Sequence, residues 1–162
     1  MDISLLMTFQ KELDERIETK HGLVKEELVE KKILALLVEL GELANETRCF
    51  KFWSEKPPAE RKVILEEYVD GVHFILSLGI TFQFQEELVT GIARQCDSLS
   101  DQFNLMYEQI SSFRKEQTEE NFVVLFDTYH TLGEMLGFHW EEIEQAYLEK
   151  NKVNHQRQQE GY

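Results

Sequence analysis

The chain has 162 residues, 42% of them hydrophobic, and its 31 acidic residues against 17 basic ones give a formal net charge of -14. That hydrophobic share is too high for a disordered chain, and so negative a surface repels nucleic acid and anionic membranes. The sequence has two cysteines in separate segments, no signal-peptide pattern and no apolar run of membrane-spanning length. We therefore expect one globular domain, residues 1–162, that is cytoplasmic and binds neither nucleic acid nor membrane.

Apolar residues recur with the helical period of 3.6 along most of the chain, and no convincing strand pattern appears. This period predicts a first helix that ends near Gly22 and a second from about residue 25 to 48. The stretch CFKFWSEKPP, which holds both prolines, breaks the pattern and predicts a loop. A third helix is expected from about residue 59 to 79.

A long fourth helix is predicted by apolar residues three and four positions apart. This coiled-coil-like seam suits a bundle or a subunit interface, and it consists of Leu88, Ile92, Cys96, Leu99, Phe103, Met106, Ile110 and Phe113. A fifth helix is expected over residues 119–136, stopped by Gly137, and a sixth from about Trp140 into a polar tail. The expected class is all-α, a helical bundle of about six helices.

Three carboxylates interrupt the apolar stretch LLVELGELANE, residues 36–46. Residues three and four apart are neighbours on a helix, so Glu39, Glu42 and Glu46 share a face. A solvated acidic stripe is the ordinary explanation of such a pattern. Here the helix is apolar almost all round between residues 33 and 44, which leaves its polar stripe little freedom to face open water.

The next predicted helix carries a matching acidic pair, Glu67 and Asp70. If the two helices pack antiparallel, the carboxylates converge, repel one another and take up protons unless a divalent cation is present. Oxygen ligands suit hard ions such as Mg²⁺ or Mn²⁺, which in turn suit a substrate with phosphates and can activate water for attack on phosphorus. Cations and amides for phosphate are concentrated in the tail, at Lys150, Asn151, Lys152, Asn154 and Arg157.

The spacing Glu39-x-x-Glu42 followed by Glu67-x-x-Asp70 resembles the metal signature of the all-α nucleoside triphosphate pyrophosphatases, the MazG-like superfamily. Within it, ELGELANETRCFKFW, EEYVDGVHF and KNKVNHQRQQEGY look like the dimeric dUTPases, and the likeness runs from about residue 9 to 162. The resemblance implies Mg²⁺-dependent hydrolysis of dUTP to dUMP and pyrophosphate, with metal-activated water attacking the α-phosphorus, in a homodimer. Some members carry a larger insertion between the later helices, which this chain largely lacks.

The resemblance also implies roles for individual residues. Glu39, Glu42, Glu67 and Asp70 would bind the metal, and either Glu42 or Glu46 would orient or deprotonate the attacking water. The tail, residues 150–162, would bind substrate through Lys150, Asn151, Asn154 and Arg157. Gln10 aligns with a glutamine near the family's uracil pocket, and Asp14 stands where the family often has asparagine. The remaining candidates for substrate contact are Phe50, Trp53, Lys56, His73 and Phe74; for Trp53 and Lys56, packing and a solvated surface are equal alternatives, and for His73 a supporting role is favoured over direct contact.

Two other functions fit parts of the sequence. A pyrophosphohydrolase of this superfamily could act on dCTP or a noncanonical triphosphate instead of dUTP. A ferritin-like di-metal protein is suggested by Asp70-x-x-His73 and Asp127-x-x-His130, although that class uses Glu-x-x-His on two helices and a glutamate from each of two others. A non-enzymatic interaction module would leave the carboxylates of residues 36–46 unexplained.

Overall fold

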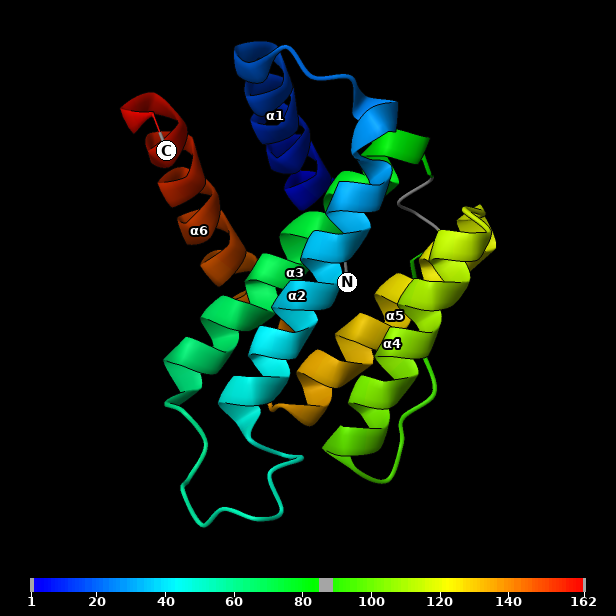
Figure 1. Cartoon of the computed structure of the whole chain (residues 1–162), viewed down its shortest axis with the longest axis vertical. Coiled ribbons are helices and arrows are strands. Elements are labelled where there is room, and N and C mark those ends of the chain that lie inside the picture. The colour runs from blue at the N-terminus through cyan, green and yellow to red at the C-terminus, as the bar shows by residue number, and fades with distance from the viewer. Residues whose placement is uncertain (1, 85–88, 162) are drawn as a thin grey trace.

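The computed structural model describes residues 2–84 and 89–161, and every regular element among them is helical (Figure 1). This confirms the all-α class. No helix in the described ranges is long and apolar enough to cross a membrane. The elements in chain order are α1 (Ser4–His21), the short 3-10 helix η1 (Lys25–Leu28), α2 (Val29–Thr47), α3 (Arg61–Phe82), α4 (Leu99–Lys115), α5 (Glu119–Met135) and α6 (Trp140–Glu160).

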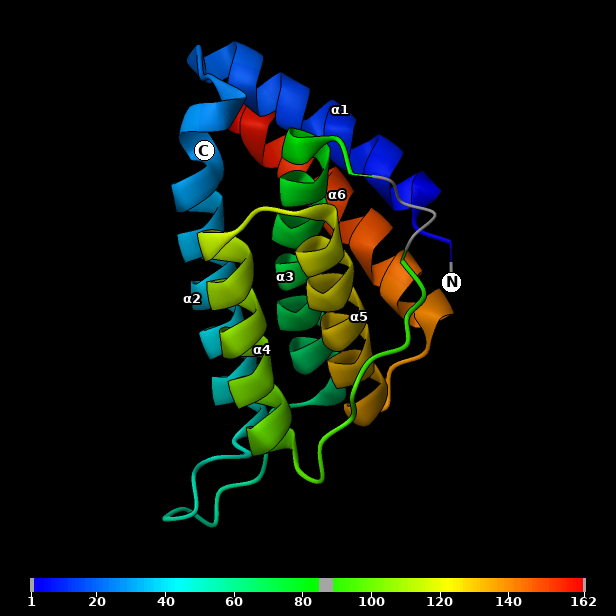
Figure 2. The same cartoon turned by 90° about the vertical axis from the view of Figure 1, so that its right-hand side faces the viewer.

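Helix α3 is the centre of the bundle. Its residues from Tyr68 to Gly79 are buried almost without interruption, and it contacts α1, α2, α5 and α6. A helix that is apolar on most of its circumference buries itself in this way. Figures 1 and 2 show α2 lying antiparallel beside α3, with α1 and α6 packed together against another side of α3. The acidic segments of α2 and α3 are therefore neighbours, as the sequence predicted.

A pair of tyrosines fixes α3 against α5. The rings of Tyr68 and Tyr129 stack with centroids 4.7 Å apart, and each hydroxyl donates to the backbone carbonyl of the other tyrosine, at 3.0 and 2.8 Å. A Cβ atom added at Gly71 would lie 2.0 Å from the Tyr129 hydroxyl oxygen, so only glycine allows this approach. The contact fixes the position of the α3 turn that carries Asp70.

Most predicted helix ends are confirmed to within a few residues. Gly22 caps α1 in the left-handed conformation, with φ of 62°. The hydroxyl of Ser98 accepts from the backbone N–H of Asp101 at 3.1 Å and caps α4, and Thr118 caps α5 in the same manner. The second predicted helix begins as η1 before α2. The polar tail continues α6 as a helix up to Glu160.

The predicted fourth helix is wrong in its first part. Within the described residues 89–98 the chain forms no helix, and α4 begins at Leu99; Leu88 lies outside the described residues. Side chains of neighbouring helices take over the backbone hydrogen bonds of this segment. Buried Asp127 accepts from the N–H groups of Thr90 and Gly91, and Gln102 accepts from the N–H of Cys96. These partners satisfy backbone groups that a helix would otherwise satisfy.

The seam on α4 faces the interior of its own chain. Phe103, Met106, Ile110 and Phe113 are all at most 4% exposed and belong to the core, whereas Ile92, in the non-helical segment, is 81% exposed. The part of the seam on α4 is thus a core face of the bundle. Because its side chains are buried within one chain, they are not accessible to a second subunit.

Candidate active site

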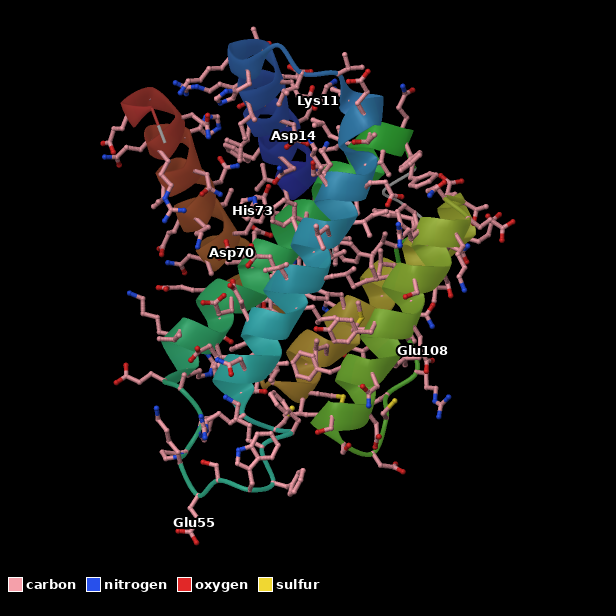
Figure 3. All side chains as sticks on the ribbon, in the orientation of Figure 1. Lys11, Asp14, Glu55, Asp70, His73 and Glu108 are labelled. Carbon is pink, nitrogen blue, oxygen red and sulfur yellow. The ribbon has the colours of Figure 1, made fainter. Side chains whose placement is uncertain are left out.

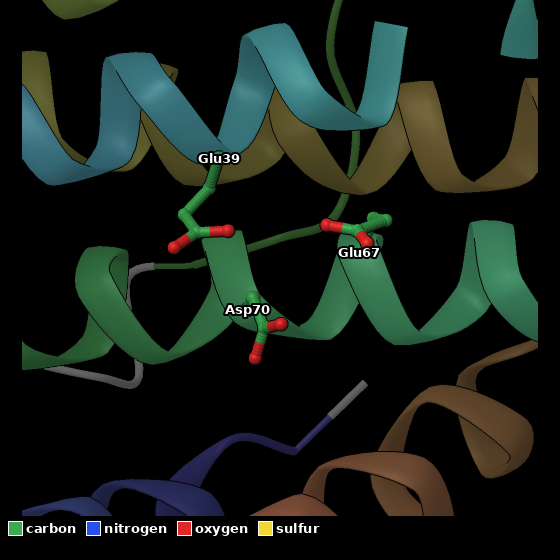
Figure 4. Close-up of side chains that lie close together, drawn as sticks. All are labelled: Glu39, Glu67 and Asp70. Atoms are coloured by element: carbon green, nitrogen blue, oxygen red, sulfur yellow. The ribbon is translucent and has the colours of Figure 1, made fainter. Parts of the chain in front are cut away.

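Three carboxylates converge between α2 and α3. Figure 4 shows Glu39 reaching from α2 towards α3, which carries Glu67 and Asp70. One oxygen from each of the three lies within 4.8 Å of the others. The antiparallel pairing of the two helices brings together these residues, which are far apart in the sequence, as predicted from their spacing. We call Glu39, Glu67 and Asp70 the acidic cluster.

The acidic cluster is electrostatically unfavourable when ionised. Burial, followed by repulsion from Asp70, Glu42 and Glu67, raises the pKa of Glu39 to about 7. Burial also raises the pKa of Glu67, with Asp70 as the next cause, and the pKa of Asp70, where Lys150 opposes the shift. Each of these carboxyl groups therefore gains from a nearby positive charge.

Helix α2, which also carries the predicted site residues Glu42 and Glu46, is less buried than its apolar composition suggested. Leu34 and Val38 on α2 are 62% and 49% exposed, and Glu42 is exposed as well. Glu42 and Glu46 lie outside the 4.8 Å group, yet both raise the pKa of Glu67 by repulsion. They border the cluster on the same side of α2.

The tail helix brings positive charge to the cluster. The ammonium of Lys150 on α6 donates to Asp70 Oδ2 at 2.6 Å. Asn151, the next residue, is 2% exposed and donates to the backbone carbonyl of Phe9 on α1 at 3.4 Å. Asn151 therefore packs α6 against α1, whereas Lys150 faces the acidic cluster.

A cavity of about 410 Å³ runs from Glu39 and Asp70 of the acidic cluster into the space between α1, α2, α3 and α6. Figure 3 labels Asp70, His73 and Asp14 along this part of the molecule. The lining combines charged, polar and apolar side chains. Its lining residues are Gln10, Leu13, Asp14, Ile17, Glu18, Leu28, Lys32, Glu39, Asp70, His73, Phe74, Ser77, Lys150, Asn154, Arg157 and Gln158.

A buried hydrogen-bond network lies at the inner end of the cavity, with Gln10 at its centre. The amide nitrogen of Gln10 donates to Asp14 Oδ1 at 2.7 Å. Its oxygen lies 2.7 Å from both His73 Nδ1 and the Tyr147 hydroxyl. The rings of His73 and Tyr147 stack with centroids 4.1 Å apart. Gln10, Asp14 and His73, three candidates from the sequence, are thus brought together.

Sequence reasoning missed three polar residues of this inner end. Ser77 donates to Asp14 Oδ2 at 2.5 Å, and the ammonium of Lys32 lies 3.7 Å from the same oxygen and 3.9 Å from Glu18. One signal was available: Gln10, Asp14 and Glu18 are spaced by four on the buried face of α1. Polar residues on an otherwise apolar face often mark a site.

Two residues that were predicted to contact substrate do not line this cavity. Trp53, 65% exposed, and Lys56 belong to the loop between α2 and α3, and neither lines the cavity. Glu55, from the same loop, is labelled in Figure 3 at the far end of the molecule from Asp14. Phe50 packs edge-on against Trp53, with centroids 6.0 Å apart. Within one chain these aromatic residues pack against each other and do not wall the cavity.

The ferritin-like reading finds no support in the described residues. The Asp127 carboxylate accepts hydrogen bonds from the backbone N–H and the hydroxyl of Thr90. His130 Nδ1 lies 3.1 Å from the carbonyl oxygen of Gly91. Neither belongs to a group of three ligand-bearing side chains in the described part of the chain. Asp127 and His130 instead hold the segment before α4.

The acidic cluster fits a divalent cation by its own chemistry. Its carboxylate oxygens are hard donors, and burial and mutual repulsion raise their pKa values, so a bound cation would stabilise the ionised forms. Comparison with protein families agrees: the dUTPase family model matches residues 2–162. This chain belongs to the dUTPase family.

The dUTPase is therefore an enzyme that hydrolyses the nucleotide dUTP, and its family implies a divalent metal. A comparison with curated proteins gave no match. The match extends over α1 and α6, so the helices that form the cavity are within the region shared with the family.

Proposed function

We propose that this dUTPase converts dUTP to dUMP and pyrophosphate by attack of water on the α-phosphorus, with Mg²⁺ held by Glu39, Glu67 and Asp70 and with Glu42 as a further ligand. The observation that carries this proposal is the single cavity that joins the acidic cluster to the buried network around Gln10. A nucleotide would fit this arrangement with its phosphates at the acidic cluster and its base at the network around Gln10.

When bound, a divalent cation neutralises phosphate charge and lowers the pKa of water near the phosphorus. The chain supplies the remaining functions. Glu42 or Glu46, both bordering the cluster, holds the attacking water and accepts its proton. Lys150, which donates to Asp70 at 2.6 Å, and Arg157, on the cavity wall, bind the triphosphate, together with Asn154. Residues 150–162 thus act as the substrate-binding part of the domain.

The inner end of the cavity is proposed to hold uracil. Gln10, Asp14 and His73 supply fixed donors and acceptors there, and Phe74 adds an apolar surface. Buried polar groups that pair with one base are left unpaired by another, which gives large discrimination. A related triphosphate such as dCTP is the second candidate substrate, because the cavity alone accepts any pyrimidine by size.

We also propose that the enzyme is a homodimer that binds no nucleic acid. Exposed Leu34 and Val38 on α2 leave apolar surface uncovered in the single chain, which supports a contact with a second copy. The formal charge of -14 opposes binding to a polyanion.

The test is an assay of pyrophosphate release from dUTP, dTTP and dCTP with Mg²⁺, with Mn²⁺ and in excess chelator. We expect dUTP to be preferred, the products to be dUMP and pyrophosphate, and chelation to stop turnover. Release of single phosphate would place the attack at another phosphorus and refute the mechanism. A preference for dCTP would transfer the proposal to the second candidate.

A further inference from the structure

One side chain of α6 contacts the acidic cluster directly. The ammonium of Lys150 donates to Asp70 Oδ2 at 2.6 Å, and the two side chains are only 21% and 20% exposed. An ion pair shielded to this degree is screened less by salt than a pair on the open surface. The contact therefore places a full positive charge beside carboxylates that repel one another.

The influence of Lys150 extends over the whole acidic cluster. Burial is the largest cause that raises the pKa of each carboxyl group in the cluster, and the charge of Lys150 opposes the rise in all of them. At Asp70 the charge of Arg157 opposes it as well. Lys150 thus acts on the cluster in the way that a bound cation would.

Lys150 and a divalent cation have a carboxylate partner in common. The three oxygens that lie within 4.8 Å of one another include one from Asp70, and Asp70 is the residue that Lys150 contacts. A cation that bound these oxygens would come close to the ammonium, and like charges repel strongly where water is partly excluded. Metal and ammonium therefore compete for the acidic cluster.

The backbone of α6 around Lys150 is held by contacts with α1. Tyr147 is completely buried, and its hydroxyl lies 3.4 Å from a backbone carbonyl oxygen of α1. Asn151 is 2% exposed and donates to another backbone carbonyl of α1. The lysine side chain, in contrast, is a flexible four-carbon stem. The ammonium can therefore leave Asp70 by rotation of its side chain alone, while the helix stays in place.

We propose that Lys150 is an exchangeable counter-ion of the acidic cluster: it neutralises the cluster when no metal is bound, an arriving divalent cation displaces it, and the released ammonium binds phosphate of the substrate. The inference rests on the proposed function, in which the cluster holds Mg²⁺ and the cavity takes a triphosphate. Because the metal must break the contact with Asp70, Lys150 weakens metal affinity in the absence of substrate. Phosphate that takes up the ammonium removes this competition, so metal and nucleotide strengthen each other's binding.

Lys150→Met keeps a long apolar stem and removes the charge. The first measurement is urea unfolding in excess chelator, with no nucleotide present. We expect a lower urea midpoint than for the wild-type protein, because removal of one partner leaves the partly buried carboxylates without their counter-ion. Lys150→Arg keeps a positive charge and should bring the midpoint back towards the wild-type value.

The second measurement is the affinity for Mn²⁺ by calorimetry, again without nucleotide. We expect the Kd of Lys150→Met to fall at least about fivefold, which is the lower end of the coupling that two linked sites commonly show. The variant would thus be less stable without metal and yet bind metal more tightly. A variant whose site is merely damaged would lose metal affinity together with stability.

Lys152→Met is the matched control. Lys152 lies on the same helix, is exposed, and lines a separate groove between α1 and α6. Its replacement lowers the net charge by the same one unit. We expect its urea midpoint in chelator and its Mn²⁺ affinity to equal those of the wild-type protein. An equal gain of Mn²⁺ affinity in both variants would attribute the effect to net charge and overturn the role of Lys150.

Displacement itself can be measured in the wild-type protein. An ammonium held in an ion pair is shielded from an acylating reagent and reacts slowly. Mg²⁺ should therefore raise the rate at which acetic anhydride modifies Lys150, relative to Lys152, as followed by mass spectrometry. An unchanged ratio of the two rates at a saturating Mg²⁺ concentration would overturn the displacement. This measurement decides the matter if Lys150→Met does not fold.

The outcomes separate this inference from the proposed function. Equal urea midpoints of Lys150→Met and Lys152→Met in chelator overturn the counter-ion role, whatever the enzyme hydrolyses. An unchanged or weaker Mn²⁺ affinity in Lys150→Met overturns the competition and assigns Lys150 to holding Asp70 in place. Absence of pyrophosphate release from dUTP refutes the proposed function, while the stability, calorimetry and labelling measurements, which use no nucleotide, still test the exchange.

Discussion

Replacing Glu39 by glutamine should stabilise the metal-free protein while it abolishes activity. Burial and repulsion raise the pKa of Glu39 from its usual 4.5 to about 7. At about 1.4 kcal/mol per pKa unit, this difference corresponds to about 3 kcal/mol for a group shielded from water. Solvent reaches part of Glu39 and screens the repulsion, so we expect about 1–2 kcal/mol. Glutamine keeps the shape and removes the charge.

The effect depends on pH in a defined window. Below a pH of 4.5 the carboxyl is protonated in both the folded and the unfolded chain, and the penalty is absent. As the pH rises to about 7, the unfolded chain loses this proton first, and the contribution of Glu39 to the free energy of unfolding falls. Above that pH both states are ionised and the full penalty remains. Glu39→Gln should therefore flatten the loss of stability across this window.

Urea unfolding at about pH 8 in excess chelator measures the difference, with Glu30→Gln as the matched control. Glu30 lies on the same helix, its side chain is 62% exposed, and it pairs with Arg114 at 2.7 Å. Loss of a surface ion pair changes stability by less than about 1 kcal/mol, and in the destabilising direction. Equal unfolding free energies for the two variants in chelator would refute the reasoning.

Adding Mg²⁺ should reverse the order of stability. A site filled at about 100 times its Kd stabilises the folded wild-type protein by about 2.7 kcal/mol. Glu39→Gln should gain less, because it lacks one ligand of the acidic cluster, and its dUTP hydrolysis should fall by orders of magnitude. Near-normal turnover in this variant would remove Glu39 from the set of metal ligands.

Three further outcomes are expected. Arg157→Lys should raise KM for dUTP at unchanged Mn²⁺ affinity in calorimetry, because lysine cannot reproduce the two parallel hydrogen bonds that arginine makes with phosphate. Gly71→Ala should lower the free energy of unfolding by about 2–3 kcal/mol in urea titrations, because its Cβ would lie 2.0 Å from the Tyr129 hydroxyl oxygen. Light scattering at micromolar concentration should give the mass of a dimer, twice the 19.2 kDa of one chain, and a monomer would contradict the proposed assembly.

The sequence alone determined the helical class, most helix ends and which carboxylates share a helix face. These features depend on local order. The 3.6-residue period places Glu39 beside Glu42 and Glu67 beside Asp70. The convergence of Glu39 with Glu67 and Asp70 was expected only if the two helices pack antiparallel, and the structure shows that they do (Figure 1).

Only the tertiary structure decided which polar groups find one another across the bundle. The segment before α4 has the apolar spacing of a helix but forms none. Asp127 on α5 accepts a hydrogen bond from the N–H of Gly91, and Gln102 on α4 accepts one from the N–H of Cys96. These two side chains take the place of the backbone partners that a helix would supply. The apolar seam from Phe103 to Phe113 has the same spacing whether it faces a partner or its own core, and burial resolved that question.

The inner end of the cavity shows most clearly what could not be predicted from the sequence. Gln10, Asp14, His73 and Tyr147 come from three helices, and their donors and acceptors have fixed directions only because each has a neighbour across the packing. Sequence spacing can place a side chain on a helix face. The direction of its hydrogen bonds depends on partners that only the packed bundle brings within reach.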